Sequence, residues 1–249
     1  MGKYDRKSTE MPTLLTPESP FAYAEAYKTL RTNLSFASFS KQYKKIIITS
    51  AIPNEGKSTV AMNLGITLAE SGAKVLLIDC DLRNPTLRRL LRVRSEYKKG
   101  LTSLLAGQAH PNDFIIKHPK IGCDVLLAGT IPPNPVELLT SPQMGALLEK
   151  FSAEYDYIIC DTPPVSVVTD AAALSRYCDG VIMVVRQNAS TREQVHIAKR
   201  NLEAVQANII GAIMSHYDMS QDTHASNSYY GGYYHYGAEE TPKKRRKLL

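Results

Sequence analysis

The chain has few cysteines and no long apolar run, and both shortages exclude classes of protein. Its 249 residues include only four cysteines, in no CxxC or Cys/His ligand spacing, so we predict buried free thiols rather than a disulfide or a metal site: Cys80, Cys123, Cys160 and Cys178. No apolar stretch approaches the roughly 20 residues of a membrane span, and the polar residues 1–10 lack the apolar core of a signal peptide. We therefore expect a cytoplasmic protein.

The chain also has little excess charge outside its C-terminal end. The net charge is +6, but a basic run at residues 243–247 supplies five of these charges and leaves +1 for the rest. The basic character is therefore typical of a solvated tail rather than of a binding face. We expect no nucleic-acid partner.

The pattern along the chain predicts one domain with a tail at each end. Residues 1–20 are polar and broken by prolines, and we predict a flexible arm. From residue 21 to about 38, apolar residues recur at helical spacing and predict an amphipathic helix: Tyr23, Ala26, Tyr27, Leu30 and Leu34. The domain then extends to residue 219, and residues 220–249 lose apolar periodicity, which predicts a disordered tail.

Short apolar runs separated by helical stretches predict an α/β fold. Runs that are apolar throughout indicate strands covered on both faces, and their alternation with helices predicts a doubly wound, mostly parallel sheet. The six runs are 46–49, 75–78, 125–127, 157–160, 181–185 and 209–214. In this architecture ligands bind beyond the carboxyl ends of the strands.

A phosphate-binding loop directly follows the first run. The order of strand, short loop, Gly56-Lys57-Ser58 and helix is the context that a P-loop requires. Lys57 is predicted to reach the β- and γ-phosphates, and the Ser58 hydroxyl to coordinate Mg²⁺. Ala51 stands where glycine is usual, and Asn54 where a further glycine is common, yet neither residue closes the loop to phosphate. The predicted nucleotide contacts are Pro53, Asn54, Glu55, Gly56, Lys57, Ser58 and Thr59.

Carboxylates end two other strands near this loop. Asp79 and Asp81 follow the second run, and Asp161 ends the fourth. A lone aspartate in such a place is usually a turn or helix cap. Two strand ends that converge on one loop favour the functional interpretation, because clustered carboxylates need a cation and ATP brings Mg²⁺.

Taken together, these segments resemble the cytoplasmic bacterial tyrosine kinases of Gram-positive capsule and exopolysaccharide operons. The matching segments are Walker A at 52–59, Walker A′ at Asp79-x-Asp81-x-Arg83, Walker B at 157–164 and residues 129–139. A terminal cluster completes the set: Tyr229, Tyr230, Tyr233, Tyr234 and Tyr236. The resemblance spans about residues 21–237, and it places the fold in the deviant-Walker class of P-loop proteins.

The resemblance implies a non-specific protein-tyrosine kinase that autophosphorylates these tail tyrosines between subunits and regulates polysaccharide synthesis and export. A phenol is a poor nucleophile until a base takes its proton, and Asp79 is our candidate, although the sequence does not rank it above Asp81. Asp81 and Asp161 are predicted to hold Mg²⁺ with Ser58, while Lys57 and Arg83 stabilise the transferring group. By analogy with the family, Ser215 and His216 are candidates for the adenine pocket.

The resemblance also implies partners. A family motif on the early helix forms a ring of identical subunits, and here it reads Glu25-x-x-Lys28-x-x-Arg31, with lysine in the middle position. Kinases of this type rely on a membrane polysaccharide co-polymerase protein for activation and for recruitment to the inner face of the membrane. A cognate tyrosine phosphatase is a further expected partner.

Two other functions stay open at this point. A partitioning or cell-division positioning ATPase shares the fold, but it usually carries an early signature lysine that residues 51–53 lack. A non-catalytic nucleotide-binding adaptor finds support only in Ala51 and Asn54. The tyrosine cluster, taken alone, also fits an aromatic low-complexity tail or a nucleic-acid stacking strip.

Overall fold

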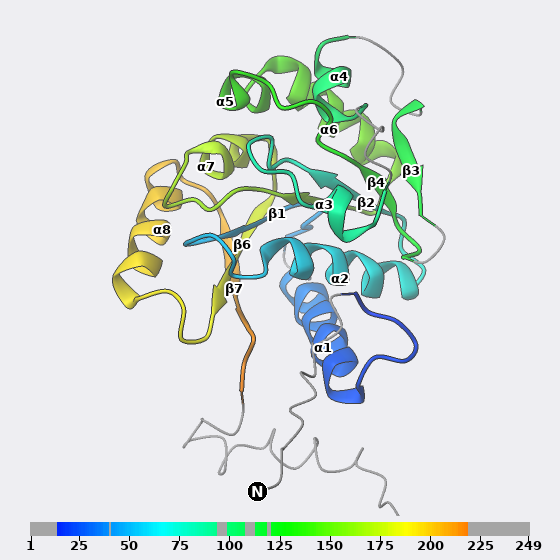
Figure 1. The fold of residues 1–249 in the computed structure, drawn as a ribbon, viewed down its shortest axis with the longest axis vertical. Coiled ribbons are helices and arrows are strands. Elements are labelled where there is room, and N and C mark those ends of the chain that lie inside the picture. The colour runs from blue at the N-terminus through cyan, green and yellow to red at the C-terminus, as the bar shows by residue number, and fades with distance from the viewer. Residues whose placement is uncertain (1–13, 40, 94–98, 108–112, 119–120, 219–249) are drawn as a thin grey trace, which may run out of the picture.

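The sheet at the centre of the molecule has seven strands in the order β3-β4-β2-β5-β1-β6-β7 (Figure 1). The structure is a computed structural model that describes residues 14–39, 41–93, 99–107, 113–118 and 121–218. Neighbouring strands run parallel, except that β3 pairs with β4 in the antiparallel sense. The strands are β1 (Lys45–Ser50), β2 (Val75–Asp79), β3 (Ile115–Lys117), β4 (Asp124–Leu126), β5 (Tyr157–Asp161), β6 (Gly180–Arg186) and β7 (Ile209–Ser215).

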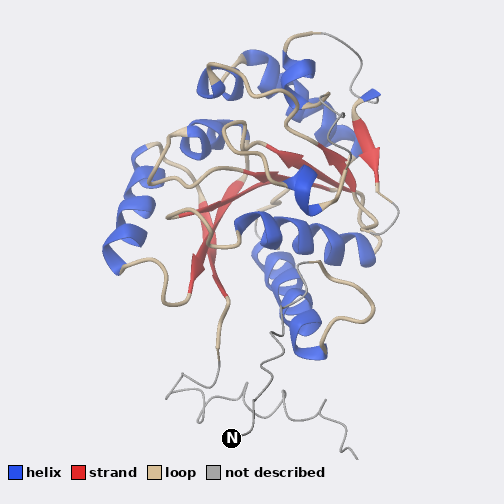
Figure 2. Ribbon diagram, viewed as in Figure 1, coloured by secondary structure: helices blue, strands red, loops and turns tan. Residues whose placement is uncertain are grey.

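Helices cover both faces of this sheet (Figure 2). On one face lie α1 (Phe21–Ala37), α2 (Lys57–Glu70) and α3 (Leu87–Leu90), which share one hydrophobic cluster. The other face packs against α4 (Leu101–Leu105), α5 (Pro135–Leu139), α6 (Pro142–Glu154), α7 (Asp170–Leu174) and α8 (Arg192–Ala204), with a 3-10 turn η2 at Ser175–Tyr177. The doubly wound, mostly parallel α/β fold predicted from the sequence is confirmed.

Alternation along the central strands explains their apolar sequences. Ile46 and Ile48 belong to the cluster under α2, whereas Ile47 points into the cluster on the opposite face, and all three side chains are fully buried. A strand between two helical layers needs apolar residues at every position. The first five predicted runs therefore became buried strands.

Two strands at the edges of the sheet differ from the prediction. β7 was expected to be covered on both faces, but Gly211 and Ala212 are exposed and Met214 is 56% exposed, because β7 is an edge strand and, among the described residues, only β6 pairs with it. β3 was not predicted at all, since its three residues are too short to show a period.

The predicted N-terminal helix is present. The described residues before it, 14–20, pack against the domain. Tyr23, Tyr27, Leu30 and Leu34 of α1 pack as predicted, but Ala26 is exposed and Ala24 packs in its place. Leu15 was assigned to a flexible arm, yet it is 7% exposed and its N–H donates to Asn63 Oδ1 of α2 at 2.9 Å. Residues 14–20 thus lie against the domain, and residues 1–13 lie outside the described part.

The cysteines are free thiols, of which three are buried and Cys178 is half-buried. Within the described ranges, no helix combines the length and the apolarity needed to span a bilayer.

Candidate active site

The loop between β1 and α2 has the backbone that a phosphate cradle needs. Asn54 and Gly56 adopt left-handed conformations, with φ of 64° and 86°, whereas Ala51 is not among the left-handed residues. Asparagine and glycine are the residues that tolerate this region, and alanine is compatible with an ordinary φ. The helix begins at Lys57, so the N–H groups of its first turn have no partner within the helix and face the loop.

Glu55 fixes the shape of this loop from inside the protein. Its side chain is fully buried, and its carboxylate accepts hydrogen bonds from the N–H of Ile52 (2.9 Å), the N–H of Arg186 (3.1 Å) and the hydroxyl of Ser190 (2.5 Å). The carboxylate therefore ties the loop to β6 and to the chain that follows it. Glu55 was predicted to contact nucleotide, and this arrangement leaves its backbone, not its carboxylate, for such a contact.

Lys57 and three aspartates meet at the carboxyl ends of β2 and β5. Asp79 and Asp161 are register partners on these two neighbouring strands. Lys57 Nζ lies 3.1 Å from Asp81 Oδ2 and 4.0 Å from Asp161 Oδ1. Asp79 accepts hydrogen bonds from the N–H of Leu87 (3.1 Å) and of Asp81 (3.3 Å). The structure thus brings together the four residues that the sequence predicted to converge.

Burial makes these charges costly. It raises the pKa of Asp79 well above its usual range, and the charge of Asp161 raises it further. The pKa of Asp161 rises to about 6 because burial outweighs the favourable charge of Lys57. The pKa of Lys57 is raised, since Asp161 and Asp81 together overcome the opposing effect of burial. One ammonium cannot balance three carboxylates, so the site favours a bound proton or a cation.

The donors here fit Mg²⁺. Both oxygens of Asp161 are buried and make no hydrogen bond to a described residue. The nearby Ser58 hydroxyl lowers the pKa of Asp161, but it does not meet the geometry of a hydrogen bond. Within the described residues, no three His, Cys, Asp or Glu side chains form a metal site of their own. Mg²⁺ is usually held by one or two carboxylates together with water and nucleotide phosphates, and Ser58, Asp81 and Asp161 offer that partial shell.

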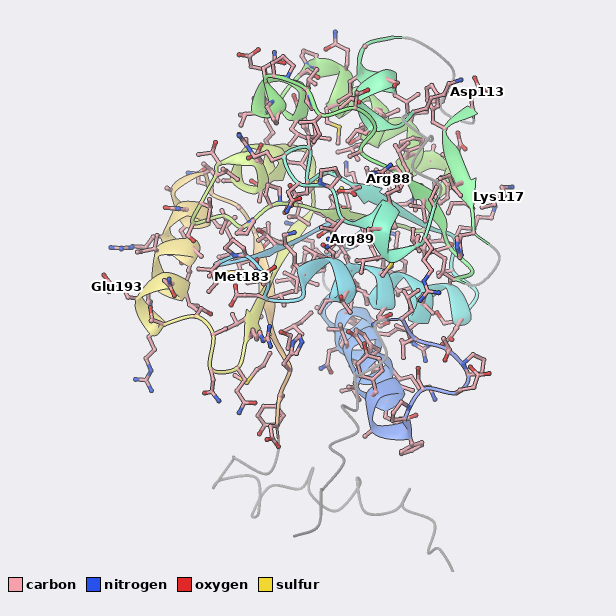
Figure 3. The ribbon with its side chains drawn as sticks, viewed as in Figure 1. Arg88, Arg89, Asp113, Lys117, Met183 and Glu193 are labelled. Atoms are coloured by element: carbon pink, nitrogen blue, oxygen red, sulfur yellow. The ribbon has the colours of Figure 1, made fainter. Side chains whose placement is uncertain are left out.

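Two polar residues at this site were not predicted. The Thr86 hydroxyl donates to the Ser58 hydroxyl at 2.8 Å, and Asp170 Oδ2 accepts a hydrogen bond from Arg83 Nε at 2.8 Å. Both are single residues with no surrounding pattern, so only their tertiary contacts reveal them. Thr86 directly precedes α3, so its hydrogen bond to Ser58 links α3 to the start of α2. Figure 3 labels Arg88 and Arg89 of α3.

The two candidate residues for the adenine pocket lie beside the loop. The Ser215 hydroxyl donates to the carbonyl of Glu55 at 2.6 Å, and a Cβ added at Gly56 would stand 3.5 Å from the ring of His216. His216 is exposed, and partial burial and the nearby charge of Arg186 lower its pKa. Both residues are therefore close to the place of a nucleotide, and their role stays a prediction.

The remaining predicted residues lie away from this centre. Lys28 forms an ion pair with Glu25 within α1 at 2.8 Å, and Arg31 Nη1 donates to the carbonyl of Thr67 in α2 at 2.8 Å. The five tail tyrosines lie outside the described residues.

Comparisons with known proteins agree with this geometry. A family model described as an AAA domain matches residues 43–216. Tyrosine-protein kinase YwqD of Bacillus subtilis is 42% identical over 208 residues, which cover 84% of this chain and 86% of that protein. Tyrosine-protein kinase etk of Escherichia coli is 37% identical over 209 residues, which cover 84% of this chain but only 28% of that protein.

Solved structures point the same way. The chimerical protein CapA2B2 is 37% identical, with a TM-score of 0.74 and coverage of 80% of this chain and 86% of that one. The septum site-determining protein MinD of Pyrococcus horikoshii, solved with Mg-ADP, is 26% identical, with a TM-score of 0.60 and coverage of 72% of each chain.

Proposed function

Because the chain belongs to the bacterial tyrosine-protein kinase family within the AAA-domain proteins, we propose that it transfers the γ-phosphoryl group of ATP to tyrosines of its own C-terminal tail. The observation that carries this proposal is the meeting of Lys57, Asp81 and Asp161 beside the loop at the start of α2. A lysine on such a loop and carboxylates that face it are the parts that phosphoryl transfer uses.

Each residue has a role that its position supports. Bound Mg²⁺·ATP would supply the phosphoryl group and a divalent charge that offsets the carboxylates. Lys57, paired with Asp81 here, would turn to the phosphate oxygens, while the hydroxyl of Ser58 and the carboxylates of Asp81 and Asp161 hold the cation. The N–H groups of residues 56–59 would bind phosphate oxygens at the helix start.

Asp79 is our candidate for the general base. Its carboxylate is held by two backbone N–H groups, and its raised pKa moves it toward that of the phenol whose proton it must accept. Asp81 is less suited to this task, because its carboxylate accepts from the N–H of Asn84 and is the proposed ligand of the cation.

We infer the substrate from the sequence of the tail. Five tyrosines lie within residues 229–236, with Gly231 and Gly232 among them, and the glycines let an extended chain enter a cleft of another subunit. Glu25, Lys28 and Arg31 on α1 are the proposed contact between subunits of a ring.

A membrane partner is part of the proposal. The likeness to the chimerical protein CapA2B2 supports an activator of the CapA type, and through it a place at the inner face of the membrane. The process under control would be capsule or exopolysaccharide synthesis, with a tyrosine phosphatase to reverse the modification.

One labelling experiment tests this function. Purified protein is incubated with ATP and Mg²⁺, phosphopeptides are mapped by mass spectrometry, and released phosphate is measured in parallel. We expect label on Tyr229, Tyr230, Tyr233, Tyr234 or Tyr236, and Lys57→Met should reduce it by at least about 100-fold. Released phosphate without label would instead indicate a positioning ATPase, and neither product would indicate a nucleotide-binding adaptor.

A further inference from the structure

Asp170 is a buried carboxylate whose position its surroundings fix. It is the first residue of α7, and its side chain is 1% exposed. Ala171, Ala172 and Leu174 of the same helix lie in the core, and α7 packs against α5. The chain that leads to α7 from Asp161 is bound to β1, since Thr162 N–H donates to the carbonyl of Ile48 and Val165 N–H to that of Ser50. The carboxylate therefore has little freedom to move.

The stability of the fold does not explain this carboxylate. Asp170 Oδ2 accepts a hydrogen bond from Arg83 Nε at 2.8 Å, but Asp170 Oδ1 is buried and finds no hydrogen-bond donor among the residues that the structure describes. Taking a carboxylate out of water is costly, and a buried ion pair often stabilises a protein no more than apolar residues would. A buried carboxylate with a hydrogen bond to only one of its two oxygens, paired with a residue of the proposed active site, points to a role other than stabilising the fold.

Arg83 binds Asp170 through Nε and not through its terminal nitrogens. The bond to Asp170 occupies Nε, while the side chain of Arg83 remains 40% exposed. Within the described part of the chain, the two terminal nitrogens of this guanidinium make no hydrogen bond to the protein. A guanidinium can bind a carboxylate along one edge and present its other donors to a phosphate, which a lysine ammonium cannot do in a fixed geometry.

The backbone places Arg83 in the turn that follows Asp81, a residue of the proposed site. Arg83 lies two residues after Asp81, which binds Lys57, and the N–H of Asn84 donates to Asp81 Oδ1 at 2.9 Å. This hydrogen bond closes a turn around Asp81, so that Arg83 leaves the same turn as the proposed cation ligand.

We propose that Asp170 is a positioning residue that holds Arg83 by Nε, so that its terminal nitrogens face the transferring phosphoryl group. This inference rests on the proposed kinase function, and it adds a residue from α7 to a site otherwise built from the loop, β2 and β5. Asp170 itself does not touch the substrate, and it acts only through Arg83.

The first test is kinetic. In the full-length protein, Asp170→Asn keeps the shape and an acceptor oxygen but removes the charge, and we expect kcat for tail labelling to fall roughly 10- to 100-fold. The KM for ATP should change less than about twofold, because the arginine acts in the transition state. Breaking the exposed pair Lys199–Glu203 of α8 by Glu203→Ala is the matched control and should leave kcat unchanged.

The second test is a double-mutant cycle with chemical rescue. Arg83→Ala should lose activity, Arg83→Lys should lose almost as much, and Arg83→Ala/Asp170→Asn should be no worse than Arg83→Ala alone. Millimolar guanidinium chloride should restore part of the activity of Arg83→Ala, since the free cation can bind Asp170. It should not restore the activity of the double variant.

Several outcomes would overturn the proposal. They are a kcat of Asp170→Asn within twofold of the wild type, losses that multiply in the double variant, or guanidinium rescue in both backgrounds or in neither. Thermal unfolding midpoints, measured for each variant, exclude loss of fold as the cause. A wild-type protein that does not label tyrosine at all would contradict the proposed function instead, so the two failures are distinguishable.

Discussion

At the scale of single residues, Asp161 is where activity and stability oppose each other. Its carboxylate is fully buried, accepts no hydrogen bond within the described part of the chain, and has a pKa raised to about 6. Holding it ionised at neutral pH costs on the order of 3 kcal/mol, because each unit of pKa shift corresponds to about 1.4 kcal/mol. A cation bound with nucleotide would remove most of this cost.

Asp161→Asn should therefore make the nucleotide-free protein more stable while it abolishes turnover. An amide cannot ionise, but its own unmet hydrogen bonds cancel part of the gain, so we expect the unfolding midpoint to rise by about 2–5 °C. Labelling with ATP and Mg²⁺ should fall at least about 100-fold. Calorimetry without nucleotide and a labelling assay measure the two effects.

Asp156→Asn is the matched control, since Asp156 is exposed and directly precedes the opposite end of the same strand. It should keep full activity. A lower midpoint for Asp161→Asn would show that the Asp161 charge stabilises the empty site, contrary to this account.

Sequence reasoning reached some residues of the site and not others, for a physical reason. Lys57, Asp79 and Asp161 follow apolar strands, and the carboxyl ends of parallel strands meet at one edge. Thr86 and Asp170 stand in segments without such a pattern, and their importance comes from contacts with Ser58 and Arg83 that only the folded chain forms.

At the scale of elements, α2 connects the site to the N-terminal helix. Asn63 of α2 accepts a hydrogen bond from the N–H of Leu15 at 2.9 Å and donates to the hydroxyl of Tyr23 at 2.8 Å. Tyr23 and Tyr27 of α1 pack edge to face with ring centroids 5.3 Å apart. The same α2 begins with Lys57, so α1 and the phosphate loop are both attached to α2.

Asn63→Ala should weaken the packing of α1 and of the preceding segment against α2. It leaves the buried N–H of Leu15 without a partner, which costs about 1–3 kcal/mol, so the unfolding midpoint should fall by roughly 2–10 °C. The substitution should accelerate the hydrogen exchange of backbone amides in α1 more than in α8. The exposed Asn134→Ala is the control, and unchanged exchange in α1 would contradict the assigned role of Asn63.

The helix and strand pattern was predictable where burial is two-sided and the element is long. The periodicity over residues 21–38 predicted α1 well, whereas the burial of Leu15 depends on one side chain of a distant helix. β7 has an apolar sequence like the inner strands, but it is an edge strand in which three of the seven residues are exposed, and no local signal distinguishes the two cases.

At the scale of the whole molecule, the active site and the proposed subunit contact lie on different elements. The site is at the carboxyl ends of β2 and β5, while Glu25, Lys28 and Arg31 lie on α1, at the far side of α2 from the sheet (Figure 1). A neighbouring subunit can therefore dock on α1 without covering the catalytic centre of the subunit to which it binds. This separation is what phosphorylation between subunits requires.

The most direct test of the central claim, phosphorylation between subunits by this site, mixes two full-length variants. One carries Lys57→Met and keeps its tail tyrosines, and the other keeps Lys57 but has all five tail tyrosines changed to phenylalanine. With ATP and Mg²⁺, neither variant alone should label its tail, and the mixture should label the tail of the Lys57→Met variant. An unlabelled tail in the mixture, beside a wild-type protein that does label itself, would contradict the account.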